Sequence, residues 1–223
     1  MEIGLPPLTM RPLPMASDDP VRGPDPAGTP PLAGRILFAE PHAVPVTPEF
    51  AASDPELELF VRQEAAHSVY HLVRLAIGFT AEPPTPRLES ASVHLTLSSP
   101  GASVQPVAWS MTPVRVTEQR ERQRTLTLSP QILFGGVEWS TTTTVPDGDT
   151  FLLAVGGRTA EPRWDLRRTR TMPLAGDQPL SLIVKAPRGA TTSITATVRA
   201  STKSALLRRY RALTGPLTLV SAL

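Results

Sequence analysis

The chain has 223 residues and a mass of 24.0 kDa, with a formal net charge of +2, 40% hydrophobic residues and 19% charged residues. This length and composition suffice to bury a hydrophobic core, which excludes a wholly disordered protein. Cysteine is absent, which excludes disulfides, thiol nucleophiles and cysteine metal sites. No apolar run reaches the ~18 residues of a membrane-spanning helix. Residues 1–32 lack the basic start and apolar block of a secretory signal, so we expect a cytoplasmic protein.

The first 50 residues are rich in proline. Proline fixes φ and lacks a backbone donor, so this stretch cannot form a regular helix or an inner strand. We predict an extended arm over residues 1–50, with one short strand at 35–39. The arm is either a flexible tail or a segment that lies along a partner chain. The second interpretation rests on five apolar side chains: Leu5, Leu8, Met10, Leu13 and Met15.

A strong helix signal follows the arm. Ser53 and Glu56 have the spacing of a capping box, and apolar residues then recur at steps of three and four up to Ala76. Gly78 provides a stop, and the prolines after it prevent a restart. The sequence therefore predicts an amphipathic helix over 54–77, within a unit of residues 51–87 that ends in a proline-rich linker.

From residue 88 to 203 the apolar period changes to two. Val93, Leu95 and Leu97 alternate with polar residues, and the same alternation recurs around 180–185 and 194–200. Turn-forming sequences separate these short segments. This pattern predicts an antiparallel β-sandwich or jelly roll over residues 88–203, and the lack of long intervening helices disfavours a parallel α/β sheet.

The last unit, residues 204–223, is predicted to hold a short helix from Ser204 and an apolar tail from Leu217 that adds an edge strand or docks on a neighbour. Charge divides along similar boundaries. Acidic residues outnumber basic ones up to residue 89, whereas basic residues dominate the remainder. This asymmetry favours docking of the acidic part on the basic part, either within one chain or head to tail between copies.

Signatures of catalysis and metal binding are missing. His67 and His71 lie one helical turn apart in the predicted helix, but the glutamate that follows the first histidine in zinc proteases is absent. No G-x-S-x-G motif provides a serine nucleophile. We therefore predict no catalytic, cofactor-binding or metal-binding residue.

Five arginines surround Trp164 within a short segment. In a strand, Trp164 anchors the core and the arginines on the other face are solvated. Alternatively, the segment binds an acidic protein segment, or it binds nucleic acid by gripping phosphates while the ring stacks on a base. The residues of this anionic-ligand alternative are Arg158, Arg163, Arg167, Arg168 and Arg170.

The sequence as a whole favours a non-catalytic structural or protein-interaction subunit of a larger assembly, and no membrane-spanning segment is predicted. Its arm and tail would contact other protein chains, with a homo-oligomer or a larger complex as the expected form. The alternative is a binding module for an anionic ligand through the arginine segment, and the third possibility is an enzyme with an unidentified site. No cofactor is expected.

Overall fold

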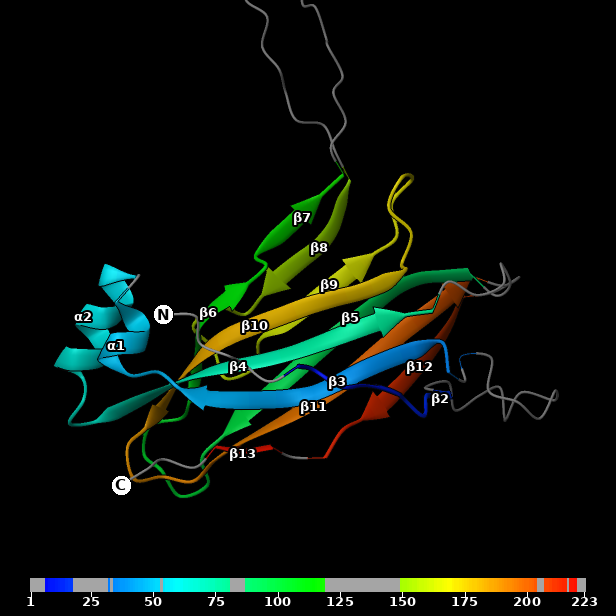
Figure 1. Ribbon diagram of the computed structural model, residues 1–223. Helices are drawn as coiled ribbons and strands as arrows, with labels where there is room; N and C mark the ends of the chain where they lie inside the picture. Colours follow the sequence, from blue (N-terminus) through cyan, green and yellow to red (C-terminus); the bar gives the residue numbers. More distant parts are fainter. Residues whose placement is uncertain are drawn as a thin grey trace, which may run out of the picture.

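The computed structural model describes residues 7–17, 32, 34–52, 54–80, 87–118, 149–203, 207–215 and 217–219. Over these ranges the chain forms two antiparallel β-sheets packed face to face, with two short helices at one end (Figure 1). The predicted mainly-β fold with an antiparallel sandwich is therefore confirmed.

The first sheet has five strands in the order β1-β3-β4-β10-β6. Its longest pairing joins β4 and β10 over twelve residues, from Ser68 opposite Pro187 to Phe79 opposite Gly176. The short strand expected at 35–39 exists and extends to Pro45. It pairs with β1 on one side and β4 on the other, so the expectation that residues 1–50 hold no inner strand is wrong. The strand accommodates its prolines because Pro41 lies at the register shift between Ala39 and His42, and Pro45 is its last residue. The strands are β1 (Met10–Pro12), β3 (Ile36–Pro45), β4 (Ser68–Phe79), β10 (Gly176–Pro187) and β6 (Val107–Thr112).

The second sheet has eight strands, and seven of them follow the order β2-β12-β11-β5-β9-β8-β7. The eighth, β13, pairs with β11 beyond the end of β12. Strands from outside residues 88–203 thus contribute to both sheets. The strands are β2 (Ala16–Ser17), β12 (Leu207–Leu213), β11 (Thr192–Lys203), β5 (Arg87–Ser98), β9 (Arg163–Arg167), β8 (Thr150–Val155), β7 (Arg115–Thr117) and β13 (Leu217–Leu219).

The main core lies between the two sheets. Alternate residues of each strand point inward, as the period of two requires, so Leu75 and Ile77 of β4 share this core with Val93 and Leu95 of β5. Trp164 is 0% exposed and is among the largest fully buried side chains. The interpretation of Trp164 as a core anchor is therefore confirmed.

The predicted helix over 54–77 is wrong beyond its first part. Helices α1 (Pro48–Ala51) and α2 (Pro55–Gln63) form, and residues 68–79 are strand β4. The cap of α2 is Asp54, whose side chain accepts a 3.1 Å hydrogen bond from the backbone N–H of Leu57. Ser53, the predicted cap, lies outside the described residues.

The physical reason is that β4 is covered on both faces. Val73, Leu75 and Ile77 face the main core, whereas Tyr70 and Leu72 face a second, smaller core beneath the helices. A strand that is covered on both faces carries apolar residues at both odd and even positions. In this stretch their spacing resembles the apolar stripe of an amphipathic helix.

A second correction concerns the C-terminal helix predicted from Ser204. Residues 207–213 form β12, in which Tyr210 and Ala212 are buried while Arg209 and Arg211 are exposed. The tail does add a strand, because β13 pairs with Thr192–Ile194 of β11.

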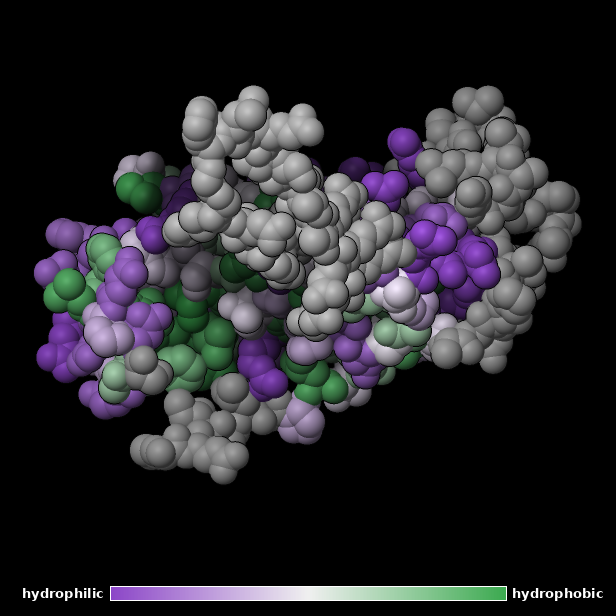
Figure 2. Space-filling view, turned by 90° about the horizontal axis from the view of Figure 1, so that it is seen from above, coloured by the Kyte–Doolittle hydropathy of each residue, from purple (hydrophilic) through white to green (hydrophobic). Residues whose placement is uncertain are grey.

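Helices α1 and α2 cover the outer face of the five-stranded sheet at one end. Leu57 and Val61 of α2 pack with Tyr70 of β4 and Ile183 of β10 in the smaller core. These helices therefore occupy the opposite side of the sandwich from the outer face of the eight-stranded sheet. Figure 2 shows hydrophilic side chains at this helical end and again at the other end of the molecule.

Candidate functional site

The outer face of the eight-stranded sheet is lined with arginines. Strand alternation places their neighbours Trp164, Val198 and Tyr210 in the core and leaves the arginines outside. We call this surface the arginine face. Its arginines come from four strands of the described part of the chain: Arg115, Arg163, Arg167, Arg199, Arg209 and Arg211.

Cross-strand pairing brings these side chains together. One row runs from Leu153 through Asp165 and Ser92 to Arg199 and Arg211. Residues directly opposite each other on neighbouring antiparallel strands have Cβ atoms ~4.5–5.5 Å apart. The pairing therefore gathers arginines that are far apart in the sequence onto one continuous surface.

One of these arginines forms an ion pair with an acidic residue of the same face. The guanidinium of Arg163 contacts the carboxylate of Asp165 at 3.0 Å, and both side chains are more than 40% exposed. Arg115 donates a 2.9 Å hydrogen bond to the hydroxyl of Thr150. Exposed ion pairs contribute little to stability because water and salt screen them. We therefore expect these charges to affect the binding of charged partners more than the stability of the fold.

His94 lies half-buried on the same face, beside Arg163 and Arg199. Burial and then the nearby positive charge of Arg199 lower its pKa, with a smaller contribution from Arg163, while Asp165 opposes the shift. Its ring Nε2 lies 3.0 Å from the hydroxyl of Ser92. His94 is therefore harder to protonate than a solvated histidine.

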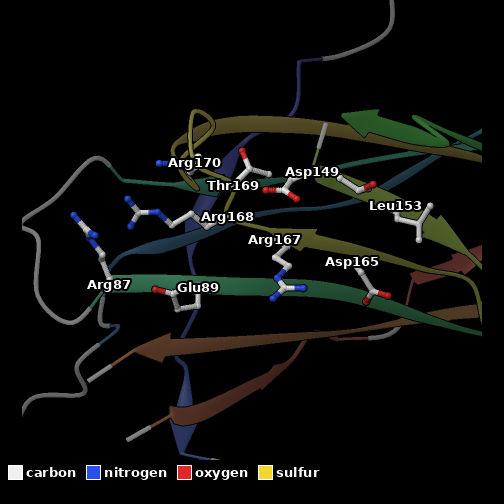
Figure 3. Close-up of a pocket in the computed structure, with 10 residues that line it drawn as sticks. Arg87, Glu89, Asp149, Leu153, Asp165, Arg167, Arg168, Thr169 and Arg170 are labelled. Carbon is white, nitrogen blue, oxygen red and sulfur yellow. The ribbon is translucent and has the colours of Figure 1, made fainter. Parts of the chain in front are cut away.

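A concavity of about 680 Å³ opens at one end of the arginine face (Figure 3). Arg87 and Glu89 reach it from β5, and Asp165 and Arg167 reach it from β9. The segment after β9 adds Arg168, Thr169 and Arg170. Four arginines and three acidic residues line the concavity, so the positive charge there is only partly balanced.

The structure divides the five arginines that the sequence grouped. Arg167, Arg168 and Arg170 line the same concavity, and Arg163 lies two residues before Asp165 on the same face of β9. Arg158 is elsewhere, with its guanidinium carbon 3.6 Å from the ring centroid of Trp109. Because Trp164 is buried, it cannot stack on a base.

The apolar arm residues also have separate environments. Met15 is only 4% exposed in the main core, and Leu13 packs against that core. Met10 pairs with Ala39 in β1 and is half-buried, as is Leu8. Leu5 lies outside the described residues. Met15 and Leu13 therefore pack within their own chain, and contact of the arm with other chains stays a prediction.

The helical end of the molecule is acidic. Glu49 of α1, Asp54 at the cap of α2, and Glu56 and Glu58 in its first turn lie close in the sequence, and we call these four residues the acidic end. Glu58 pairs with Arg62 at 2.6 Å. Leu59, on the same helix, is 52% exposed.

The histidines do not converge on a metal. His67 is exposed in the turn after α2, whereas His71 is buried on the inward face of β4, so the predicted helical pair does not form. No group of three histidine, aspartate or glutamate side chains that could hold a metal ion occurs among the described residues. Within the same part of the chain, no helix is both long enough and apolar enough to cross a membrane.

Sequence reasoning missed four arginines of the arginine face. Arg115 stands in a three-residue strand, and Arg199 stands among apolar, serine and threonine residues in a strand that ends at Lys203. Arg209 and Arg211 were assigned to a helix. Their alternation with Tyr210 and Ala212 is the signal of a strand with a basic outer face.

Comparison with known proteins adds two solved structures. One is described as a pore forming protein, with 6% identity, a TM-score of 0.35, and coverage of 83% of this chain and 90% of that chain. The other is Clostridium perfringens delta-toxin, with 7% identity, a TM-score of 0.31, and coverage of 82% and 88%. A likeness at this identity and TM-score does not indicate a function. No protein-family model and no curated protein matches the sequence.

Proposed function

We propose that this chain is a non-catalytic subunit of a homo-oligomer, in which the acidic end of one copy binds the arginine face of the next. The observation that carries the proposal is that one chain presents two surfaces of opposite charge on opposite sides of its sandwich. Complementary potentials of this kind guide encounter and set the orientation of a complex.

The geometry favours contact between copies over contact within one copy. The helices that carry the acidic end pack on the outer face of the five-stranded sheet through Leu57 and Val61. The arginine face is the outer face of the other sheet. The two surfaces are therefore separated by the thickness of the sandwich, and the acidic end can reach an arginine face only on a neighbour.

Exposed leucines accompany both surfaces. Leu59 is 52% exposed at the acidic end, and Leu153 and Leu213 are 40% and 64% exposed on the arginine face. Burying such side chains in an interface supplies affinity that screened surface charges alone do not. Both surfaces thus combine charge for orientation with apolar area for binding.

An interface between two different patches of the same chain is heterologous. Such contacts generate a ring where the rotation between copies closes, and an open filament where it does not. The expected product is therefore a ring or a filament rather than a two-fold dimer.

The test removes the charge of each surface in turn and measures the mass in solution. We expect the unaltered protein to form oligomers at low salt that dissociate in about 1 M salt, where the Debye length falls to ~3 Å. Glu49→Lys with Glu56→Lys cancels the negative charge of the acidic end, and Arg199→Glu with Arg209→Glu removes most of the positive charge of the arginine face. All four side chains are exposed. Each pair of changes should leave a folded monomer by circular dichroism and sedimentation.

Two further samples make the test specific. A mixture of the two variants should form heterodimers, because each variant retains one intact surface and the assembly then terminates. The chain with all four substitutions should stay monomeric, because it keeps neither surface intact. A monomeric unaltered protein at every concentration, or oligomers that both variants retain, would disprove the proposal.

Nucleic acid is the competing ligand for the arginine face. A monomeric protein that binds an oligonucleotide, with affinity falling steeply as salt rises, would replace the homo-oligomer by the nucleic-acid interpretation. Among the described residues, the arginines of this face are not accompanied by an exposed aromatic ring on which a base could stack. The structure therefore gives self-association the stronger support.

A further inference from the structure

A second recess lies around Trp109, away from the arginine face. It is an open groove of about 930 Å³ between the turn after α2, the β5–β6 loop and the β10–β11 turn. Its volume lies within the range of ~300–1,000 Å³ that is typical of small-molecule sites. We infer that this groove binds a small amphiphilic anion, which carries a carboxylate or phosphate group on an apolar body.

The floor of the groove is a fixed aromatic ring. Phe60 of α2 and Tyr70 of β4 contact Trp109 edge-on, with ring centroids 4.7 Å and 5.8 Å away. Edge-to-face packing of this kind orients a ring without covering both of its faces. Val107 also lines the groove, and Val104 at its lip is 64% exposed. An apolar ligand body therefore finds a preformed surface here.

Cations surround this ring. The guanidinium carbon of Arg158 lies 3.6 Å from the ring centroid of Trp109, and the ammonium nitrogen of Lys185 lies 5.6 Å from it. Arg188, a third lining residue, donates a 2.6 Å hydrogen bond from Nε to the carbonyl oxygen of Ala65. A guanidinium stacked on a ring keeps a planar fork of N–H donors at its edge, which suits bidentate contact with a carboxylate or phosphate.

The carboxylate of Glu64, which also lines the groove, already interacts with two neighbouring side chains. Glu64 accepts hydrogen bonds from Lys185 and from the Tyr70 hydroxyl, at 2.5 Å and 2.7 Å. The first of these contacts and then the second lower the pKa of Glu64. Glu64 therefore compensates Lys185, and the charge that remains for a ligand is the positive charge of Arg158 and Arg188.

The backbone holds Arg158 in an unusual conformation. Its φ of 65° makes it the one residue other than glycine with positive φ among those described. The backbone N–H of Arg158 donates a 2.7 Å bond to the carbonyl of Ala108, and the N–H of Ala108 donates to the carbonyl of Thr159 at 2.9 Å. Backbone conformations of this kind cluster at ligand-binding positions, where surrounding contacts maintain them.

The experiment titrates the full chain with octanoate by calorimetry. Three matched probes separate the two features of the ligand: octanamide lacks the charge, acetate lacks the apolar body, and octyltrimethylammonium reverses the charge. Octyl phosphate tests whether a phosphate replaces the carboxylate. We expect octanoate and octyl phosphate to bind and the three matched probes to bind at least tenfold more weakly.

Variants tie the binding to the groove. Arg158→Lys keeps a positive charge but loses the planar fork, and we expect a loss of tenfold or more in octanoate affinity. Arg11→Lys, the same change at an exposed position of β1 outside the groove, should leave that affinity unchanged. Circular dichroism confirms that both variants are folded. Octanoate binding no tighter than octanamide or acetate, or equal binding by Arg158→Lys and the unaltered chain, would overturn the inference.

Discussion

The indole N–H of Trp164 donates a 3.1 Å hydrogen bond to the carbonyl oxygen of Pro113. This bond joins β9 to the turn between β6 and β7, and it satisfies the one polar atom of a side chain that is 0% exposed. A buried tryptophan usually finds such a partner. Trp164 thus combines a packing role with a hydrogen bond to the turn through which the chain passes from β6 of one sheet to β7 of the other.

Substitution of Trp164 should therefore be costly. We expect Trp164→Ala to lower the free energy of unfolding by about 3–5 kcal/mol. Trp164→Phe should cost less, because it retains an aromatic ring but loses the hydrogen bond. Urea unfolding followed by circular dichroism measures both. Trp109→Phe is the control, and its cost should be below that of Trp164→Phe, since Trp109 is only half-buried. The reverse order would contradict the assignment of Trp164 as the core anchor.

Gly156 and Gly157 should respond differently to the same substitution. Gly156 has a φ of 82°, and a Cβ added there would lie 2.7 Å from the backbone oxygen of Glu161. Left-handed conformations cost a residue with a side chain about 1–2 kcal/mol even without a clash, so Gly156→Ala should destabilise the fold by at least that amount. Gly157→Ala meets nothing within 4 Å and should change stability by no more than ~0.5 kcal/mol. Thermal unfolding of the two variants compares them, and equal midpoints would refute the prediction.

The pH dependence of stability should contain a contribution from His94. Its pKa is lowered in the folded state from the ordinary value of 6.5, so the unfolded chain binds a proton more readily. Stability should therefore fall as pH decreases below about 6.5, until the folded protein is protonated as well. His94→Gln should flatten this part of the curve. His42→Gln, at an exposed position, is the control, and a curve that His94→Gln leaves unchanged would exclude the contribution.

The burial of His71 distinguishes the observed strand from the predicted helix. In β4, His71 is 3% exposed and Leu72 is only partly buried beneath the helices. We expect His71→Ala to destabilise the protein by clearly more than the ~0.5 kcal/mol of a typical surface change. A helix over 54–77 predicts that His71→Ala has little effect. Urea unfolding of the variant decides between the two, and a negligible loss would favour the helix.

Removal of the arm tests its place in the fold. If residues 1–50 were only an extended arm, a chain beginning at Pro48 would stay folded. In the structure that chain would lose β1, β2 and the whole of β3, together with the buried side chains of Met15, Ile36 and Phe38. Each large buried side chain contributes ~1.5–3 kcal/mol, so we expect the shortened chain to unfold. A cooperative thermal transition close to that of the full chain would show that the arm is dispensable.

The sequence predicts those parts of the fold in which one face of a strand is solvated. β5 and β11 alternate apolar and polar residues, and both were assigned to a sandwich. The alternation does not occur in β4, because α1 and α2 cover its outer face and apolar residues therefore occupy both faces of the strand. In β12, the step of three from Leu207 to Tyr210 and Leu213 resembled a helical face, although Arg209 and Arg211 alternate with Tyr210 and Ala212.

The candidate sites were harder to predict than the fold. Arg163, Arg167, Arg168 and Arg170 are close in sequence, so their grouping was visible. Their neighbours on the arginine face are brought in by pairing of β9 with β5 and of β5 with β11, which depends on register rather than on local pattern. The contact of Arg158 with Trp109 likewise joins a turn to a distant strand. Non-local pairing of this kind leaves no signal in a single sequence.

One N-terminal segment closes both sheets on the same side. Met10–Pro12 forms the edge strand beside β3, and Ala16–Ser17 forms the edge strand beside β12, with only Leu13, Pro14 and Met15 between them. Unpaired edge strands are templates for pairing with another chain. Detachment of this segment would open two edges at once, and the neighbour best matched to them is the same segment from a second copy. The fold thus holds a route to strand exchange, in which two chains trade their first strands and remain interlocked.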